Sequence, residues 1–267
     1  METRLRLDML PQPDETTCGP TSLHAVYRFY GDQVDLAEMI PEVRRLENGG
    51  TLAGMLGGHA LRRGYSATIF TYNVQIFDPT WFEAGSVQLR EKLAEQARVK
   101  KNRKLRIATE GYLEFLELGG KLAFEDLTHG LIARYLARGI PILTGLSATY
   151  LYRAPREYGP KADFDDIRGK PAGHFVVLCG YDPASRKVLV ADPLFPNPWF
   201  ESHMYEIDVD RVICSILLGI LTYDATLLII EPKDRQPSSP LDGLAAAAAP
   251  AVVGEPGSAA HGHPDRR

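Results

Sequence analysis

The amino-acid sequence predicts an α+β fold in which a helical N-terminal part packs against an antiparallel sheet, with a cleft between them. Helical periodicity dominates the first half and is clearest in the apolar run of residues 18–30. In the second half, residues 173–182 and 187–191 have the pattern of two strands joined by a turn at 183–186, which predicts an antiparallel hairpin. Short apolar runs at 140–146 and 226–230 predict further strands.

The helices of the first half follow from apolar residues spaced along one helix face and from the residues that begin and end them. The first helix begins near Cys18, where Pro20 suits an opening turn because its missing amide hydrogen needs no partner there, and it ends at Gly31. A strand-like stretch at 4–10 precedes it. The other elements expected before residue 120 are helices at 35–45, 51–64 (capped by Thr51), 88–101 and 109–118 and a strand at 66–72.

Beyond residue 120, helices and apolar strands alternate. The polar loop at 157–170 comes just before the hairpin, and we consider two roles for it, a wall of the cleft or a disordered connection. The other expected elements are a helix at 126–138, a strand at 140–146 that continues through 150–153, a helix at 208–221 and a last strand at 226–230.

Length and composition favour one folded domain. The chain has 267 residues, of which 45% are hydrophobic and 24% are charged, and both values are ordinary for a globular protein. We expect one domain over 1–231, with a helical insertion at about 78–120 beside the cleft. Proline, alanine and glycine replace the apolar periodicity from residue 232, which predicts a disordered tail over 232–267.

Charge and hydropathy exclude several classes of function. The net charge of −4 gives no bias towards nucleic acid or anionic membranes. The basic cluster at 100–106 has no aromatic platform, so we interpret it as a solvated helix end and expect no nucleic-acid partner. The longest apolar run, near 213–221, is too short to span a bilayer, and residues 1–10 lack the apolar core of a signal peptide. We therefore expect no membrane span and a cytoplasmic location.

The three cysteines are too few for a disulfide framework. Cys179 lies in an apolar strand pattern and Cys214 in an apolar helix pattern, which predicts that both are core residues. Cys18 differs because it stands at the first turn of a helix, where the positive end of the helix dipole favours a thiolate. Its position is typical of a sulfur nucleophile, and it also suits a buried structural cysteine.

The predicted hairpin supplies a base for this nucleophile. His174 lies at the start of the first strand and Asp192 at the end of the second, so both side chains are expected at the same rim. A carboxylate beside a histidine fixes its tautomer and stabilises the imidazolium. Cys18, His174 and Asp192 therefore form a candidate set of nucleophile, base and orienting acid. Asp182, at the other end of the hairpin, is the alternative acid.

These residues resemble the motifs of a known family. The pattern consists of Gln12, then Cys18-Gly-Pro, then Gly173-His-Phe-Val-Val, then Val190-x-Asp-Pro. It is similar to that of the bacteriocin-processing (double-glycine leader) peptidases and their stand-alone relatives, which are papain-like cysteine peptidases. The motifs cover about 10–29 and 172–193. Members fused to export transporters also contain membrane spans and a nucleotide-binding domain, which this sequence does not predict.

The resemblance implies a papain-like fold and acyl-transfer chemistry that requires no metal or cofactor. By resemblance, Cys18 is the nucleophile, His174 the general base and Asp192 the third member. Gln12 is by resemblance the oxyanion-hole side chain, beside the backbone amide of Cys18. The implied function is hydrolysis of a peptide or small amide substrate, as in the maturation or trimming of a small peptide. The sequence identifies no peptide-ligase or export partner.

Two other functions remain open from the sequence. One is a papain-like acyl transferase or transpeptidase, which shares the first half-reaction and passes the acyl group to an amine rather than to water. The other is a non-catalytic peptide-binding module of the same fold. The complete set of Cys, His, Asp and Gln argues against the second alternative.

Overall fold

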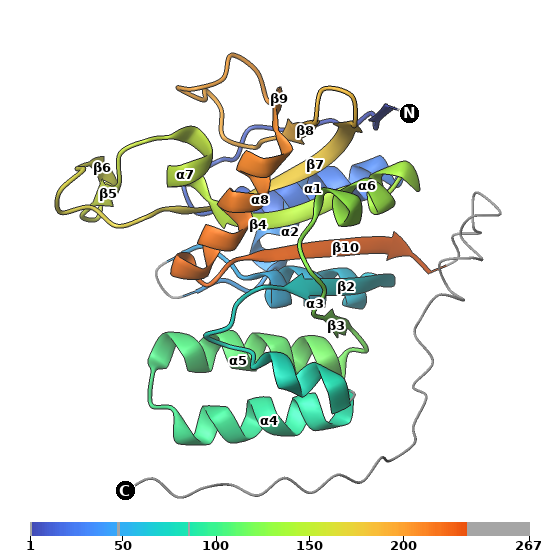
Figure 1. Ribbon diagram of the computed structural model, residues 1–267, viewed down its shortest axis with the longest axis vertical. Coiled ribbons are helices and arrows are strands. Elements are labelled where there is room, and N and C mark those ends of the chain that lie inside the picture. Colours follow the sequence, from blue (N-terminus) through green and yellow to red (C-terminus); the bar gives the residue numbers. More distant parts are fainter. Residues whose placement is uncertain (1, 47–48, 85, 234–267) are drawn as a thin grey trace, which may run out of the picture. The chain divides into compact units, whose positions relative to one another are not determined.

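The computed structural model describes residues 2–46, 49–84 and 86–233 (Figure 1). The predicted α+β class is confirmed, because helices pack on a mostly antiparallel sheet with the strand order β3-β2-β10-β4-β7-β8-β9, and β1 pairs with β7. The main sheet consists of β1 (Thr3–Arg4), β2 (Tyr65–Thr71), β3 (Lys121–Ala123), β4 (Ile142–Ser147), β7 (Gly173–Asp182), β8 (Lys187–Ala191), β9 (Met204–Asp208) and β10 (Thr226–Pro232). A separate hairpin joins β5 (Glu157–Tyr158) to β6 (Asp163–Phe164).

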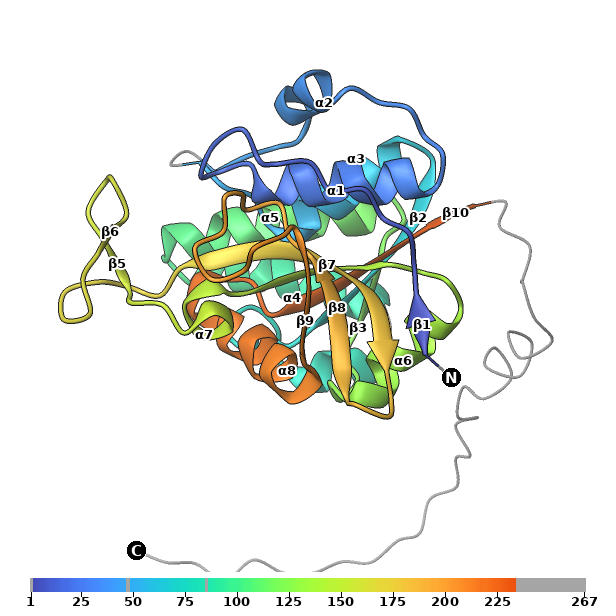
Figure 2. The same cartoon turned by 90° about the horizontal axis from the view of Figure 1, so that it is seen from above.

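Helices lie on both faces of this sheet (Figure 2). The helices associated with one apolar core are α1 (Cys18–Phe29), α2 (Leu36–Glu42), α3 (Ala53–Arg62), α4 (Ser86–Val99) and α5 (Arg103–Glu117). Those associated with the other are α6 (His129–Ala137), α7 (Ala148–Tyr152) and α8 (Val209–Leu218). Because side chains alternate along a strand, β7 contributes Phe175 and Val177 to the first core and Val176 and Leu178 to the second.

The β7–β8 hairpin has the bounds that the sequence predicts. Its turn is stabilised by Asp182, whose carboxylate accepts hydrogen bonds from the backbone amides of Ala184 and Ser185 at 2.9 and 3.2 Å. Arg186 completes the turn in the left-handed region with φ 56°. The two strand ends that hold His174 and Asp192 therefore meet at one rim.

Residues 150–153 do not continue β4 as expected. They lie in and directly after α7, because the side chain of Ser147 accepts a hydrogen bond from the Tyr150 amide at the start of this helix. Arg153 ends the helix in the left-handed region. This short helix brings Tyr152 to the rim where β7 begins, since Ser147 is paired with Gly173.

Other details differ from the sequence-based expectation. The N-cap of α3 is Leu52 rather than Thr51, whose hydroxyl donates to the Arg44 carbonyl instead. Strand β9 was not predicted. Cys179 is buried as predicted, but Cys214 is exposed. The reason is that α8 buries Val212 and Ile216 on one side, and residue 214 lies about half a turn away from both.

The segment 78–120 contains the 3₁₀ helix η1 (Pro79–Ala84), α4 and α5. Its interpretation as an insertion that affects substrate choice stays a prediction, as do the boundaries 1–231 and 232–267. From residue 234 onward the expected tail lies outside the described residues. Among the helices that the structure describes, none has the length and apolar character needed to cross a membrane.

Candidate active site

Cys18 is the first residue of α1, so its backbone amide has no acceptor within the helix. The side chain is 8% exposed. The first turn of α1 packs tightly, because a Cβ added to Gly19 would lie 2.3 Å from the Thr51 methyl group. One turn later, the Ser22 hydroxyl donates to the Phe175 carbonyl at 3.1 Å. This bond holds the beginning of α1 beside the beginning of β7, where His174 lies.

His174 and Asp192 form a buried ion pair across the rim of the β7–β8 hairpin. The distance from His174 Nε2 to Asp192 Oδ1 is 2.8 Å, and the two residues are 6% and 0% exposed. The Cys18 side chain lies close enough to the same imidazole to raise its pKa. Since Nε2 is engaged by Asp192, Nδ1 is the nitrogen that remains for Cys18. The structure therefore brings the three predicted residues together, with His174 between Cys18 and Asp192.

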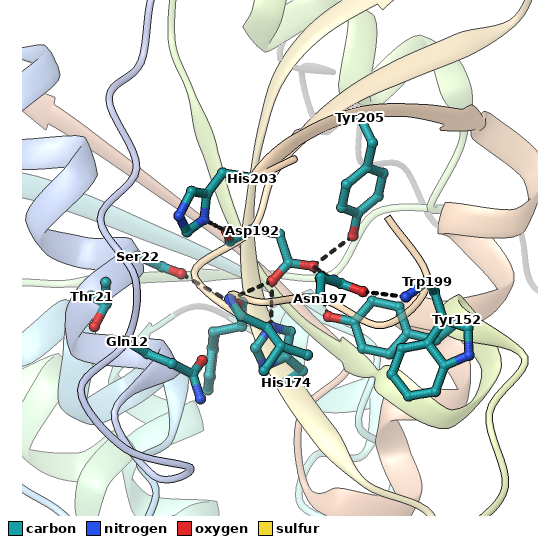
Figure 3. Close-up of polar contacts among 12 residues, drawn as sticks. Gln12, Thr21, Ser22, Tyr152, His174, Asp192, Asn197, Trp199, His203 and Tyr205 are labelled. Carbon is teal, nitrogen blue, oxygen red and sulfur yellow. Dashed lines mark hydrogen bonds and ion pairs between the residues drawn. The ribbon is translucent and has the colours of Figure 1, made fainter. Parts of the chain in front are cut away.

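The Asp192 carboxylate is surrounded by donors (Figure 3). Oδ1 accepts from His174 and from the Leu194 amide at 2.9 Å. Oδ2 accepts from the hydroxyls of Tyr152 and Tyr205, both at 2.7 Å, and from Asn197 Nδ2 at 3.5 Å. This many donors around a fully buried group favours the carboxylate over the neutral acid.

The electrostatics of the pair favour two charged groups. Burial alone lowers the pKa of His174, but the charge and hydrogen bond of Asp192, together with the contact with Cys18, raise that pKa to about 10. Burial raises the pKa of Asp192, and the imidazolium and the two tyrosine hydroxyls more than offset it, so this pKa lies below its usual value. Burial and the Asp192 charge also raise the pKa of Tyr205, which keeps its hydroxyl a donor.

Gln12 lies next to this pair. Its backbone amide donates to the Pro193 carbonyl at 2.8 Å, which attaches the loop before α1 to the residue that follows Asp192. Its side-chain Nε2 donates to the Asp14 carbonyl at 2.9 Å, which uses one of the two amide hydrogens. The other hydrogen has no acceptor among the described residues. Oε1 is enclosed and has no hydrogen-bond partner among the described residues.

A cleft of about 250 Å³ adjoins the imidazole. Gln12 and His174 line it together with the aromatic side chains of Tyr152, Trp199 and Phe164. Phe164 belongs to β6, so the loop at 157–170 forms a wall of this cleft. Across the parts of the chain that the structure describes, no three His, Cys, Asp or Glu side chains are grouped to hold a metal ion.

The residues around Asp192 were missed by sequence reasoning. Tyr152 was assigned to a strand, Tyr205 belongs to the unpredicted β9, and Asn197 lies in an aromatic loop. No local signal identifies them, because each reaches Asp192 only through the tertiary fold. His203 was also missed; its Nδ1 is 2.6 Å from the Asp192 carbonyl, and its own carbonyl accepts from the Asp192 amide at 2.8 Å.

A second buried carboxylate, Asp224, lies on the other side of residue 173. It is 6% exposed, and its Oδ2 accepts from the Thr222 hydroxyl at 2.7 Å. A Cβ on Gly173 would lie 2.5 Å from this oxygen, so only glycine fits beside it. Burial raises the pKa of Asp224 to about 7, although Thr222, Lys104 and His174 lower it. The site thus has one acid held ionised and one that titrates near neutrality.

Asp224→Asn is expected to reduce the pH dependence of stability. The pKa of about 7 lies above the ordinary 3.8, so folding favours the neutral acid, and wild-type stability falls as the pH rises from about 4 to 7. Urea unfolding at pH 5 and pH 8 measures this. Between pH 5 and pH 8, the free energy of unfolding should fall by about 2 kcal/mol more in the wild type than in the variant. An equal loss in both proteins would contradict the assignment.

Comparison with known proteins finds one family match, which covers part of the chain. A model described as the Peptidase_C39 like family matches residues 123–212, the segment that contains His174 and Asp192. The resemblance predicted from the motifs is confirmed for this segment; Gln12 and Cys18 lie outside it. No curated protein matches the sequence.

Two solved structures are similar to this chain. One is a double glycine motif protease from an AMS/PCAT transporter in complex with the leader peptide, with 14% identity over 86% of this chain and 95% of that one, and a TM-score of 0.41. The other is the peptidase domain of Streptococcus ComA, a bi-functional ABC transporter of a quorum sensing pathway, with 15% identity over 86% of this chain and 99% of that one, and a TM-score of 0.40.

Proposed function

We propose that this chain, part of which matches the Peptidase_C39 like family, is a cysteine peptidase that hydrolyses a peptide or amide bond. The observation that carries the proposal is the buried His174–Asp192 pair at 2.8 Å, with Cys18, at the beginning of α1, close enough to the imidazole to raise its pKa. A charged imidazole beside a sulfur at a helix N-terminus is the arrangement that activates a thiol.

In the proposed mechanism, the Cys18 thiolate attacks the carbonyl carbon of the substrate and forms a tetrahedral oxyanion. The free backbone amide of Cys18 and the remaining amide hydrogen of Gln12 donate to this oxygen. His174 then gives its proton to the leaving amine, which produces a thioester on Cys18. The neutral imidazole next activates water, whose attack releases the acid and restores the thiolate–imidazolium pair.

Asp192 acts on this cycle through His174. Its bond to Nε2 fixes the ring and leaves Nδ1 for Cys18, so in this mechanism the proton is exchanged through Nδ1. Tyr152 and Tyr205 donate to the other carboxylate oxygen and hold it in place. A working thiol also requires reducing conditions, which supports the cytoplasm as the proposed location.

Incubation with a defined peptide mixture tests the proposal. The mixture should include peptides with a double-glycine motif, as the sequence resemblance suggests, and mass spectrometry identifies new termini. We expect cleavage by the wild type and none by Cys18→Ala. If an added amine, such as glycine amide, appears in the product in place of water, the enzyme is an acyl transferase. Intact peptides with both proteins, together with an unreactive Cys18, would refute the catalytic assignment.

Gln12→Ala is expected to lower kcat by about 10²–10³, the effect of losing one oxyanion-hole donor. Alkylation of Cys18 by iodoacetamide forms no oxyanion, so its rate should change little. The matched control is Gln33→Ala, at an exposed residue before α2. Loss of both hydrolysis and alkylation in Gln12→Ala would indicate a displaced loop, and unchanged hydrolysis would exclude the assigned role.

A further inference from the structure

The cleft beside His174 has an aromatic wall. Tyr152 and Trp199 stack with ring centroids 4.9 Å apart and an interplanar angle of 3°. Phe164 meets Trp199 edge-on, with the centroids 5.9 Å apart, and is 59% exposed. The volume of about 250 Å³ is below the roughly 300–1,000 Å³ of typical small-molecule sites, which suits one side chain of a longer ligand.

Apart from His174, the charged side chains that line this cleft are Glu15 and Glu157. Glu15 precedes α1, and Glu157 belongs to β5, so the two approach from different parts of the chain. Within the described residues, neither carboxylate takes part in a hydrogen bond or an ion pair. A cleft lined by aromatic rings and by two carboxylates that lack an ion-pair partner attracts a cation.

The two carboxylates affect each other. Glu157 is half-buried; burial and the charge of Glu15 raise its pKa, and the His174 charge lowers it. Among the charges that act on Glu157, only that of His174 opposes the repulsion from Glu15, and His174 is itself paired with Asp192. Two nearby cations are engaged elsewhere, because Arg156 donates to the Asp166 carbonyl and Arg168 pairs with Asp165. Lys170 pairs with Glu157 through the backbone, and within the described residues the two side chains form no ion pair.

We propose that this cleft is a specificity subsite that binds a lysine or arginine side chain of the peptide substrate, with the aliphatic stem or guanidinium plane against the aromatic wall and the positive group between Glu15 and Glu157. This proposal rests on the proposed peptidase function. Aromatic faces attract cations, and guanidinium groups stack on them. The cation would also relieve the repulsion between the two carboxylates.

Charged thiol reagents test the electrostatic part without a known substrate. Three methanethiosulfonates are compared at Cys18: the trimethylammonium-ethyl, the uncharged methyl and the sulfonatoethyl compound. The background is Cys214→Ser, because Cys214 is exposed and would react as well. The cationic reagent's rate divided by the anionic reagent's rate should fall roughly fivefold in Glu157→Gln, as expected for unit charges a few ångströms apart. Glu15→Gln should lower this ratio by a similar factor. Glu91→Gln, at an exposed residue of α4, is the matched control and should leave the ratio unchanged.

Substrate peptides test the recognition itself. Each position of a cleaved peptide is replaced in turn by lysine, norleucine or glutamate, in acetylated and free N-terminal forms. At one position lysine should exceed norleucine in kcat/KM, and Glu157→Gln should reduce this preference about tenfold. A preference for norleucine would show an apolar subsite and overturn the proposal. If kcat/KM depends only on whether the peptide N-terminus is free, the cleft binds an ammonium terminus rather than a side chain. This result would also overturn the proposal.

These outcomes separate this inference from the proposed function. If Cys18 fails to react with the uncharged reagent and no peptide is cleaved, the peptidase assignment fails. If Cys18 reacts in a His174-dependent manner but the charge ratio is the same in wild type, Glu15→Gln and Glu157→Gln, the peptidase assignment stands. The cationic subsite is then wrong.

Discussion

Replacement of His174 by alanine is expected to reduce peptide hydrolysis by at least about 10³-fold, because the variant loses both the base that ionises Cys18 and the acid that protonates the leaving amine. The same change should slow alkylation of Cys18 by iodoacetamide at pH 7. The imidazolium that stabilises the thiolate is then absent, although the cysteine stays at the beginning of α1.

The pH dependence of alkylation distinguishes an ion pair from a merely accessible thiol. With a pKa of about 10, His174 remains protonated through the neutral range, so the wild-type advantage over His174→Ala should be largest near pH 7. It should shrink above about pH 8.5, where an ordinary free thiol ionises without help. Rates are measured by mass spectrometry of the Cys18 peptide in a Cys214→Ser background.

His129→Ala is the matched control, because His129 is exposed at the first turn of α6. It should match the wild type in hydrolysis and alkylation. Equal alkylation rates of Cys18 in wild type and His174→Ala across the pH range would mean that His174 does not promote ionisation of the thiol. The thiol would then be structural, and the proposed mechanism would lose its first step.

Local sequence patterns predicted the elements that place this site. The strand alternation and turn residues around Asp182 define the β7–β8 hairpin, and they bring His174 and Asp192 to one rim without reference to the rest of the chain. Pro20 in the opening turn and the apolar periodicity of residues 18–30 likewise place Cys18 at a helix start. The bond from Ser22 to the Phe175 carbonyl, which joins these two local units, spans more than 150 residues and has no sequence signature.

What sequence reasoning missed depends on long-range contacts. Tyr152 was assigned to a strand because β-branched and aromatic residues favour strands, yet the side-chain cap from Ser147 starts a helix there. Tyr205 lies on an edge strand, β9, whose existence depends on pairing with β8. No local pattern around Asp224 predicts its burial, because the burial depends on Gly173, a residue distant in sequence that packs against it. Cys214 was placed in the core because an apolar helix pattern does not by itself show which face is covered.

Asp192→Asn is expected to destabilise the protein by about 3–5 kcal/mol and to lower kcat by about 10²–10⁴. The amide keeps the size of the carboxylate but has an acceptor on one side only. If its oxygen faces His174, its NH₂ group faces the hydroxyls of Tyr152 and Tyr205, whose hydrogens then lose their carboxylate acceptor. If its oxygen faces the tyrosines, the NH₂ group meets the Leu194 amide and the imidazole instead. Either orientation leaves buried donors without an acceptor.

Urea unfolding of Asp192→Asn alone and combined with Tyr205→Phe tests this reasoning. The second substitution removes one donor that has lost its acceptor, so the double variant should lose less stability than the sum of the single changes.

The stability contributed by Asp192 should also depend on pH. Because the pKa of Asp192 lies below the ordinary 3.8, this contribution is present above that pH and disappears as the pH falls through the folded-state value. The difference in free energy of unfolding between the wild type and Asp192→Asn should therefore be large at pH 7 and small in acid. Asp182→Asn, in the turn at the other end of the hairpin, should retain activity. Additive losses in the double variant would mean that the tyrosines do not act through this carboxylate.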